Sequence, residues 1–379
     1  MKKIDNIMVL YRKPHITKIA IIVFGLLLIA HSNFGQVEKT LKKEEKNIQT
    51  SNKRIDKLSA EEYFAKGNNA YESEFYELSI EYYQKAIEID PNFAEAYSNM
   101  GMAYKNQKNY AQAIRCFQKA IEIDPNYAEA YYNMGIAYRQ QENYAQAIRY
   151  YRKAIEIDPN DAEAYNNMGS AYDNQGDYAQ AIRCYQKAIE INPNDAYAYN
   201  NMGATYKAQG NYAQAIRCYQ KAIEINPNNA DAYSNMGIAY DDLKNYTQAI
   251  RCYQKAIEID PNHAVAYNNM GATYNQQENY TQAIGCYQKA IEINPNDATA
   301  YYNMGNAYKA QENYAQAIRC YRKAIEINPN DADAYYSMGN AYDDQENMRR
   351  QYVVTKKQQK AIRTTQKHTK IWELPTLTK

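Results

Sequence analysis

Apolar and small side chains recur every three or four residues through the middle of the chain, in short blocks that polar segments interrupt. Between Ala128 and Asp161, the first block holds Tyr131, Met134, Gly135 and Tyr138, and the second holds Ala147, Ile148, Tyr151, Ala154 and Ile155. This spacing places each block on one face of a helix. The polar run RQQENY separates the blocks and DPND follows the second, so the pattern predicts a helix, a turn and a second helix.

The same pattern returns with a fixed period of 34 residues, marked by proline. The prolines are Pro91, Pro125, Pro159, Pro193, Pro227, Pro261, Pro295 and Pro329. When the third residue after each proline is taken as position 1, repeats begin at residues 60, 94, 128, 162, 196, 230, 264 and 298, with half of a ninth from 332. One hairpin alone would leave an apolar face in water, so neighbouring repeats are expected to stack.

Individual residues predict where the helices end and how closely they approach. Pro159 cannot donate a hydrogen bond inside a helix and restricts Asp158, so the second helix should end there. Asp161 is a favourable N-cap for the next helix. Gly135 and Ala154 lack bulk where the two helices meet, and the large tyrosine rings are expected to fill the space around them.

These positions carry a known repeat pattern: an aromatic at position 4, Met-Gly at 7 and 8, Tyr at 11, Ala at 20, an aromatic at 24, Ala at 27 and Pro at 32. The pattern resembles the tetratricopeptide repeat (TPR) family, over Ala60 to about Asn347. Tyr stands where the family often has Trp at position 4, and Met stands where it has Leu at position 7. The resemblance implies an all-α, right-handed superhelical solenoid of about eight and a half repeats, with the first helix of each repeat on the concave side.

Position 6 of the first helix holds a carboxamide in seven successive repeats: Asn99, Asn133, Asn167, Asn201, Asn235, Asn269 and Asn303. A carboxamide both donates and accepts hydrogen bonds, so such a ladder can pair with an extended peptide backbone whatever its side chains are. It is similar to the asparagine ladder in the repeat domain of O-linked N-acetylglucosamine transferases. We therefore predict that these asparagines bind peptide, together with Tyr132 and Tyr302 at the variable position 5. The alternative is that each asparagine only bonds a neighbouring helix, or is inherited with each copied repeat.

Some relatives clamp a C-terminal carboxylate with cationic side chains, but here Phe64, Glu129 and Asn133 occupy those cationic places. Binding of terminal carboxylates is therefore not expected. Position 12 alternates in sign through Lys105, Arg139, Asp173, Lys207, Asp241 and Lys309, which predicts no single-charge patch there.

The chemistry of the chain favours binding over catalysis. With 44 basic and 43 acidic residues, the net charge is +1, so no overall field attracts nucleic acid or anionic lipid. Only His263 of the four histidines lies inside the repeats, and no phosphate loop or nucleophile motif occurs. We expect no enzyme activity, metal, cofactor or nucleic-acid partner. Six cysteines at position 23 should be free thiols, because stacked hairpins separate them too far for disulfides: Cys116, Cys184, Cys218, Cys252, Cys286 and Cys320.

The chain begins with basic residues, the apolar run 19–30, and small residues at Ser32 and Gly35. Residues 1–35 therefore resemble a secretory signal peptide, or an uncleaved membrane anchor. This predicts an exported protein, periplasmic or extracellular, or a membrane-anchored one. Residues 36–59 are charged and poor in aromatics, as in a solvated linker.

The repeat pattern stops in mid-unit after Asn347, where QEN leads into MRRQYV instead of YAQAIR. Codons that encode residues 347–356 also permit the repeat sequence YAQAIRCYQ in another reading frame, and codons for 370–376 permit NMGIAY in that frame and in register. We infer a one-base deletion after the Asn347 codon, which would make residues 348–379 an out-of-frame, disordered tail.

Taken together, these features predict a TPR solenoid over residues 60–347 that binds proteins or extended peptides along its concave groove and catalyses nothing. One alternative is the substrate-recruiting part of a larger glycosyltransferase-like enzyme, cut short by the frameshift. Another is a structural spacer that uses the solenoid for reach. The sequence predicts neither the partner nor the oligomeric state.

Overall fold

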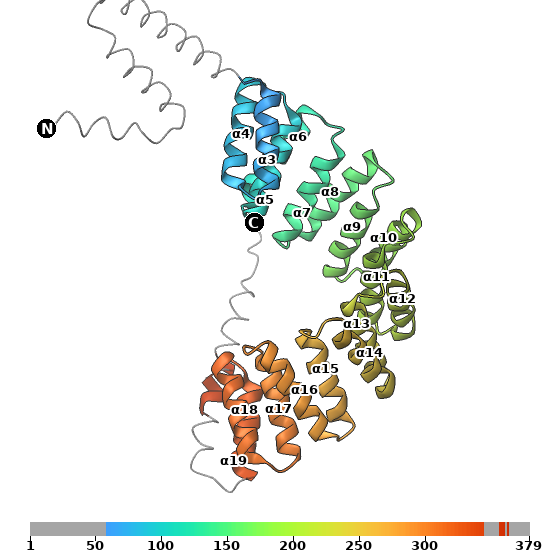
Figure 1. Ribbon diagram of the computed structural model, residues 1–379, viewed down its shortest axis with the longest axis vertical. Helices are drawn as coiled ribbons and strands as arrows, with labels where there is room; N and C mark the ends of the chain where they lie inside the picture. The colour runs from blue at the N-terminus through green and yellow to red at the C-terminus, as the bar shows by residue number, and fades with distance from the viewer. Residues whose placement is uncertain (1–57, 345–355, 361, 364–379) are drawn as a thin grey trace, which may run out of the picture. The chain divides into compact units, whose positions relative to one another are not determined.

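The computed structural model describes residues 58–344, 356–360 and 362–363 (Figure 1). Within these residues the chain is helical and contains no strand, as the repeat pattern predicts. Residues 1–57 and most of the tail lie outside the described residues, so the predictions of a signal segment, a linker and an out-of-frame tail stay predictions.

Each repeat contributes a first helix of 13 residues and a second helix of 14 residues. The first helices are α3 (Ala60–Glu72), α5 (Ala94–Asn106), α7 (Ala128–Gln140), α9 (Ala162–Asn174), α11 (Ala196–Ala208), α13 (Ala230–Asp242), α15 (Ala264–Gln276), α17 (Ala298–Ala310) and α19 (Ala332–Asp344). The second helices are α4 (Tyr76–Ile89), α6 (Tyr110–Ile123), α8 (Tyr144–Ile157), α10 (Tyr178–Ile191), α12 (Tyr212–Ile225), α14 (Tyr246–Ile259), α16 (Tyr280–Ile293) and α18 (Tyr314–Ile327).

The chain divides into two compact units, residues 1–112 and 113–379, with the boundary inside α6. In the first unit, α4 packs against α3 of its own repeat and against α5 of the next. The second unit repeats this arrangement from α7 to α19, and each second helix there packs between two first helices.

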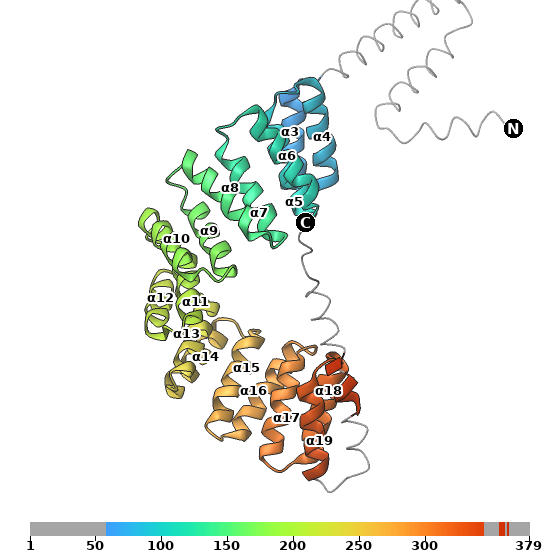
Figure 2. The same cartoon turned by 180° about the vertical axis from the view of Figure 1, so that it is seen from behind.

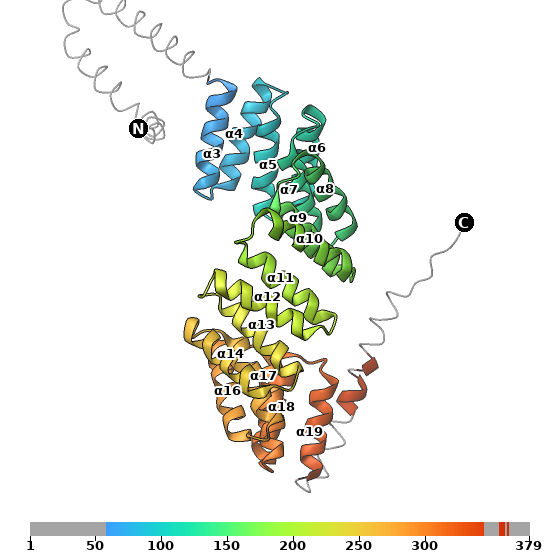
Figure 3. The ribbon, with the colours of Figure 1, turned by 90° about the vertical axis from the view of Figure 1, so that its right-hand side faces the viewer.

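Within the second unit, the first helices form a row of neighbours. Each of α7, α9, α11, α13, α15 and α17 contacts the next first helix, whereas no two of the described second helices are in comparable contact. Figures 1 and 2 show these hairpins following one another in chain order, and Figure 3 shows the same succession from the side. The row of first helices is therefore the more closely spaced side of the stack, which we call the inner face.

A glycine and a tyrosine set the distance between the two helices of a repeat. A Cβ atom added to Gly135 would lie 2.6 Å from the ring of Tyr151, and one added to Gly203 would lie 2.7 Å from Tyr219. Both rings are fully buried. The prediction that tyrosine rings fill the space left by glycine is confirmed, and at these contacts no larger residue fits without moving a ring.

The helix ends follow the local signals. The α8 helix ends at Ile157, directly before Asp158 and Pro159, and the side chain of Asp161 accepts a hydrogen bond from Ala164 N at 2.9 Å. Between the two helices of a repeat, the chain turns through a residue with positive φ, such as Gly210 at 75° or Glu278 at 59°. Such a residue stops the first helix, because αL geometry cannot continue a right-handed helix.

Candidate peptide-binding site

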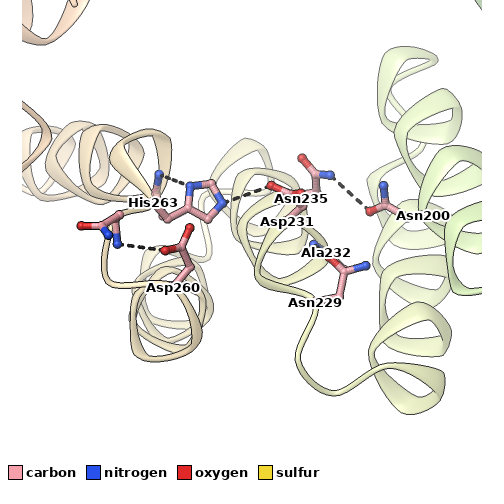
Figure 4. Close-up of polar contacts among 9 residues, drawn as sticks. Asn200, Asn229, Asp231, Ala232, Asn235, Asp260 and His263 are labelled. Carbon is pink, nitrogen blue, oxygen red and sulfur yellow. Dashed lines mark hydrogen bonds and ion pairs between the residues drawn. The ribbon is translucent and has the colours of Figure 1, made fainter. Parts of the chain in front are cut away.

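The predicted carboxamide ladder lies on the first helices that form the inner face, and most of its members bond a side chain of the preceding repeat. The Nδ2 group of Asn201 donates to Asn166 Oδ1 at 3.2 Å. Asn235 donates in the same way to Asn200 Oδ1, also at 3.2 Å (Figure 4). Position 6 of one repeat thus bonds position 5 of the preceding repeat, 35 residues earlier.

The same link recurs with other residues at position 5. Asn167 Nδ2 donates to the hydroxyl of Tyr132 at 2.9 Å, and Asn303 Nδ2 donates to Asn268 Oδ1 at 3.4 Å. In the first unit position 5 is Phe64, which has no acceptor, and Asn99 Nδ2 donates instead to Asn68 Oδ1 at 2.9 Å. The ladder is therefore a structural clasp between repeats, which is the first alternative weighed for it.

The clasp is interrupted at one joint of the second unit. Position 5 is Ser234 there, and no hydrogen bond joins it to Asn269 in the described part of the chain. The serine side chain is short and buried, so it cannot span the distance that an asparagine or tyrosine spans elsewhere.

The remaining hydrogen-bonding capacity of the ladder decides what it can offer a ligand. Asn133 is only 4% exposed, so it presents little surface, whereas Asn167, Asn201, Asn235, Asn269 and Asn303 are half-buried, as are Asn99, Tyr132 and Tyr302. Within the described residues, the Oδ1 atoms of Asn201, Asn235 and Asn303 accept no hydrogen bond from the protein, and they are not sealed from solvent. These oxygens are acceptors held in place by the amide group beside them.

A hollow of about 520 Å³ opens beside the ladder, between the repeats that begin at 162 and 196. It is lined by Ala162, Glu163, Asn166, Asn167, Asn192, Asp195, Tyr197 and Asn201. Four carboxamides, including Asn167 and Asn201 of the ladder, thus line one hollow together with Tyr197, which is 71% exposed.

Glu163, Asp195 and Tyr197 were not predicted as site residues. Their signal in the sequence is weak: position 2 is acidic in most repeats but Tyr, Val or Thr in three of them. Glu163 also bonds a predicted site residue, because the hydroxyl of Tyr132 donates to Glu163 Oε1. Burial, together with that carboxylate, raises the pKa of Tyr132.

The described residues include side chains of the kinds that hold metal ions or act as nucleophiles. They contain no group of three or more His, Cys, Asp or Glu side chains that could hold a metal ion. All six cysteines are free, as predicted, and all six are buried. Burial raises the pKa of Cys184, Cys218, Cys252, Cys286 and Cys320 to about 11, so their thiols stay protonated near neutral pH and are poor nucleophiles.

The sequence matches models of known protein families. A model described as the C-terminal domain of cilia and flagella-associated protein 70 matches residues 156–368, more than half of the chain. Models described as tetratricopeptide repeat and TPR repeat match residues 92–160 and 62–108. The chain belongs to the tetratricopeptide repeat family.

Solved structures resemble this TPR protein in fold. The crystal structure of the APC/C hetero-tetramer Cut9–Hcn1 matches with a TM-score of 0.52 and 19% identity, over 70% of this chain and 52% of that chain. The TPR protein thus spans about half the length of that structure, and the likeness shows the fold alone. A search of curated proteins found no match.

Two shorter proteins also match. A crystal structure of MamA has 31% identity and a TM-score of 0.41, over 44% of this chain and 96% of that chain. YrrB, described as a TPR protein with an unusual peptide-binding site, has 28% identity and a TM-score of 0.42, over 48% of this chain and 95% of that chain. Membership of the tetratricopeptide repeat family fits a role in protein interaction.

Among the described residues, no helix is both long and apolar enough to cross a membrane. The apolar run 19–30 lies outside the described residues.

Proposed function

We propose that this TPR protein is a non-catalytic scaffold that binds extended peptide segments of other proteins along its inner face. The observation that carries the proposal is a row of half-buried carboxamides beside a hollow of about 520 Å³; within the described part of the chain, the Oδ1 atoms of Asn201, Asn235 and Asn303 accept no protein hydrogen bond. Asn201 and Asn235 lie on α11 and α13, and the hollow is lined by residues of α9, α11 and the joint before α11.

The spacing of the ladder suits an extended chain. Packed helices lie about 8–10 Å apart, and an extended peptide rises about 3.3 Å per residue. One carboxamide oxygen on each first helix would therefore meet about every third backbone N–H of the peptide. Such backbone recognition is tolerant of side-chain identity, which suits a scaffold.

The clasp between repeats makes the ladder more effective as a receptor. Since Asn201 and Asn235 each commit an N–H to the preceding repeat, their side chains are already oriented before a ligand arrives. A preordered side chain loses less conformational entropy on binding than a free one. The structural role and the binding role of the ladder are thus compatible.

A peptide library screened against the full chain would supply ligands for the test. The variant Asn167→Ala, Asn201→Ala, Asn235→Ala should weaken their binding about tenfold or more, because each lost hydrogen bond contributes about 0.5–1.5 kcal/mol. The matched control replaces three exposed carboxamides of the second helices, Gln186→Ala, Gln220→Ala and Gln254→Ala. Equal affinity of both variants, with helix content retained, would contradict the proposal.

We also propose that residues 1–35 direct the protein out of the cytoplasm or anchor it to a membrane, on the basis of the apolar run 19–30. Cell fractionation tests this directly. A full-length product in the cytosol would contradict it.

A further inference from the structure

A second hollow lies on the other side of Tyr197, at the ends of the repeats. Its volume is about 440 Å³, and its walls include Asp231, Asp260, His263 and Val265 together with Tyr197. Tyr197 therefore stands between two concavities, one beside the ladder and one at the joints that lead into α13 and α15.

Both hollows are lined by carboxylates, and neither is lined by a lysine or an arginine. Glu163 and Asp195 line the first, and Asp231 and Asp260 line the second. The side chain of Asp231 is 81% exposed. Each hollow is thus a concave, single-sign surface that would attract positive charge.

The histidine of the second hollow lies against its acidic wall. His263 Nδ1 accepts a hydrogen bond from Ala266 N at 3.4 Å, and its Nε2 lies 3.3 Å from Asp231 Oδ1 (Figure 4). The side chain of His263 thus caps α15 and lies beside the carboxylate of Asp231.

The acidic character continues along the joints between repeats. The joint segments 191–197, 225–231 and 259–265 contain no lysine or arginine, and the same holds for the equivalent segments of the other repeats. At the opposite end of the hairpins, the turns carry both signs, as at Lys244 and Glu278. The joints therefore differ from the turns in carrying acidic side chains without any lysine or arginine beside them.

Two exposed apolar side chains complete the surface. Tyr197 and Val265 both occupy position 2, where most repeats have an acid, and their exposed fractions are 71% and 57%. A tyrosine ring can bind the side chain of arginine or lysine over its face, and valine can pack against the aliphatic part of such a side chain.

We propose that the joints from α9 to α15 bind a lysine- or arginine-rich segment of a partner protein, whose cations occupy the hollows on either side of Tyr197. This inference rests on the proposed function, since it names the chemistry of the peptide that the scaffold takes. Charge complementarity and the concave shape select a basic peptide over an acidic or a neutral one.

The test uses the full chain and three labelled 12-residue peptides in which Gly and Ser alternate with Arg, Gln or Glu. Fluorescence anisotropy at low and at physiological salt should show binding of the Arg peptide only, and its affinity should fall about tenfold or more as the salt concentration rises.

The variant Glu163→Gln with Asp231→Asn should weaken binding of the Arg peptide about tenfold. Tyr197→Thr, which places at position 2 the residue found at Thr299, should weaken it about threefold. The matched control neutralises two exposed acids in the opposite turns, Glu278→Gln with Glu312→Gln, and should change affinity less than twofold.

Equal binding of the Gln and Arg peptides would overturn this inference and leave the proposed function standing. Failure of all three peptides, and of every peptide in the library, would overturn both. Equal loss in the acidic-joint variant and in its control would also overturn the inference. Tighter binding of the Arg peptide after residues 349–370 lose their basic side chains would show that this chain's own tail is the occupant, and would overturn the assignment to a partner.

Discussion

The hydroxyl of Thr205 lies 2.6 Å from Asp173 Oδ1, so a buried threonine of one repeat is bonded to a carboxylate of the repeat before it. The same pair recurs two repeats later, where the hydroxyl of Thr273 lies 2.7 Å from Asp241 Oδ1. Where the preceding repeat has a cation at position 12, as at Arg139, Lys207 and Lys309, the next repeat has alanine at position 10 instead: Ala171, Ala239 and Ala341. The residue at position 10 of a repeat is therefore matched to the charge at position 12 of the repeat before it.

Replacing Thr205 with valine should destabilise the protein by about 1.5–3 kcal/mol, because the variant loses a hydrogen bond to a charged group. Chemical unfolding of the full chain measures the change, and Thr299→Val, at an exposed threonine, serves as the control.

The double variant Asp173→Lys with Thr205→Ala recreates the natural Lys207 and Ala239 pair. We expect the double variant to be more stable than the sum of the two single changes by about 1 kcal/mol, and strict additivity would argue against matching.

Gly203→Ala should destabilise the protein by about 1–3 kcal/mol, because the new methyl group would meet the Tyr219 ring at 2.7 Å. Gly285 offers a matched control: it lies inside α16, and an added Cβ would have no neighbour within 4 Å. Gly285→Ala should therefore stabilise by about 0.5–1 kcal/mol, through helix propensity alone. Thermal unfolding followed by circular dichroism would show opposite shifts, and shifts of the same sign would contradict the packing account.

Two equivalent tyrosines should respond differently to loss of their hydroxyl groups. Tyr321 donates to Asn306 Oδ1 at 2.8 Å, whereas the buried Tyr219 hydroxyl has no hydrogen-bond partner among the described residues, since Ala204 occupies the place of Asn306. Tyr321→Phe should cost about 1 kcal/mol, and Tyr219→Phe should be neutral or stabilising. Denaturant midpoints of both variants measure this, and an equal loss would be inconsistent with it.

The buried thiols predict a loss of stability at alkaline pH. Burial raises the pKa of Cys218 from 9.0 to about 11, so the folded state holds a proton that the unfolded state releases. The stabilisation is complete below pH 9 and is lost as pH rises through 11. Cys218→Ala should reduce the dependence of unfolding free energy on pH in this window, and an unchanged slope would refute the assignment.

The repeat architecture was predictable because its determinants are local and periodic. The pairing of Gly135 with Tyr151 follows from residue volume at fixed positions of one hairpin, and the cap at Asp161 follows from its place after Pro159. The cap at Asp161 was predicted and is confirmed, and so is the prediction that a tyrosine ring fills the space beside Gly135. Helix ends and helix packing within a repeat involve residues close in sequence, so a 34-residue window contains the information.

The contacts between repeats were harder to predict. The bond from Asn201 to Asn166 depends on how far one first helix is shifted along its neighbour, which residue types alone do not determine. The alternating charges at position 12 predicted only that no single-charge patch forms there, and gave no sign that Asp173 bonds Thr205. The hollows around Tyr197 were missed because they form only when three joints lie side by side.

Photo-crosslinking tests the central claim most directly, because it reports where a peptide lies. A peptide from the library, carrying a benzophenone side chain at its centre, would be irradiated with the full chain and the adduct located by mass spectrometry. The account predicts adducts on the first helices, centred on α9, α11 and α13, and their loss in the Asn167, Asn201 and Asn235 variant. Adducts confined to α10, α12 and α14 would contradict it.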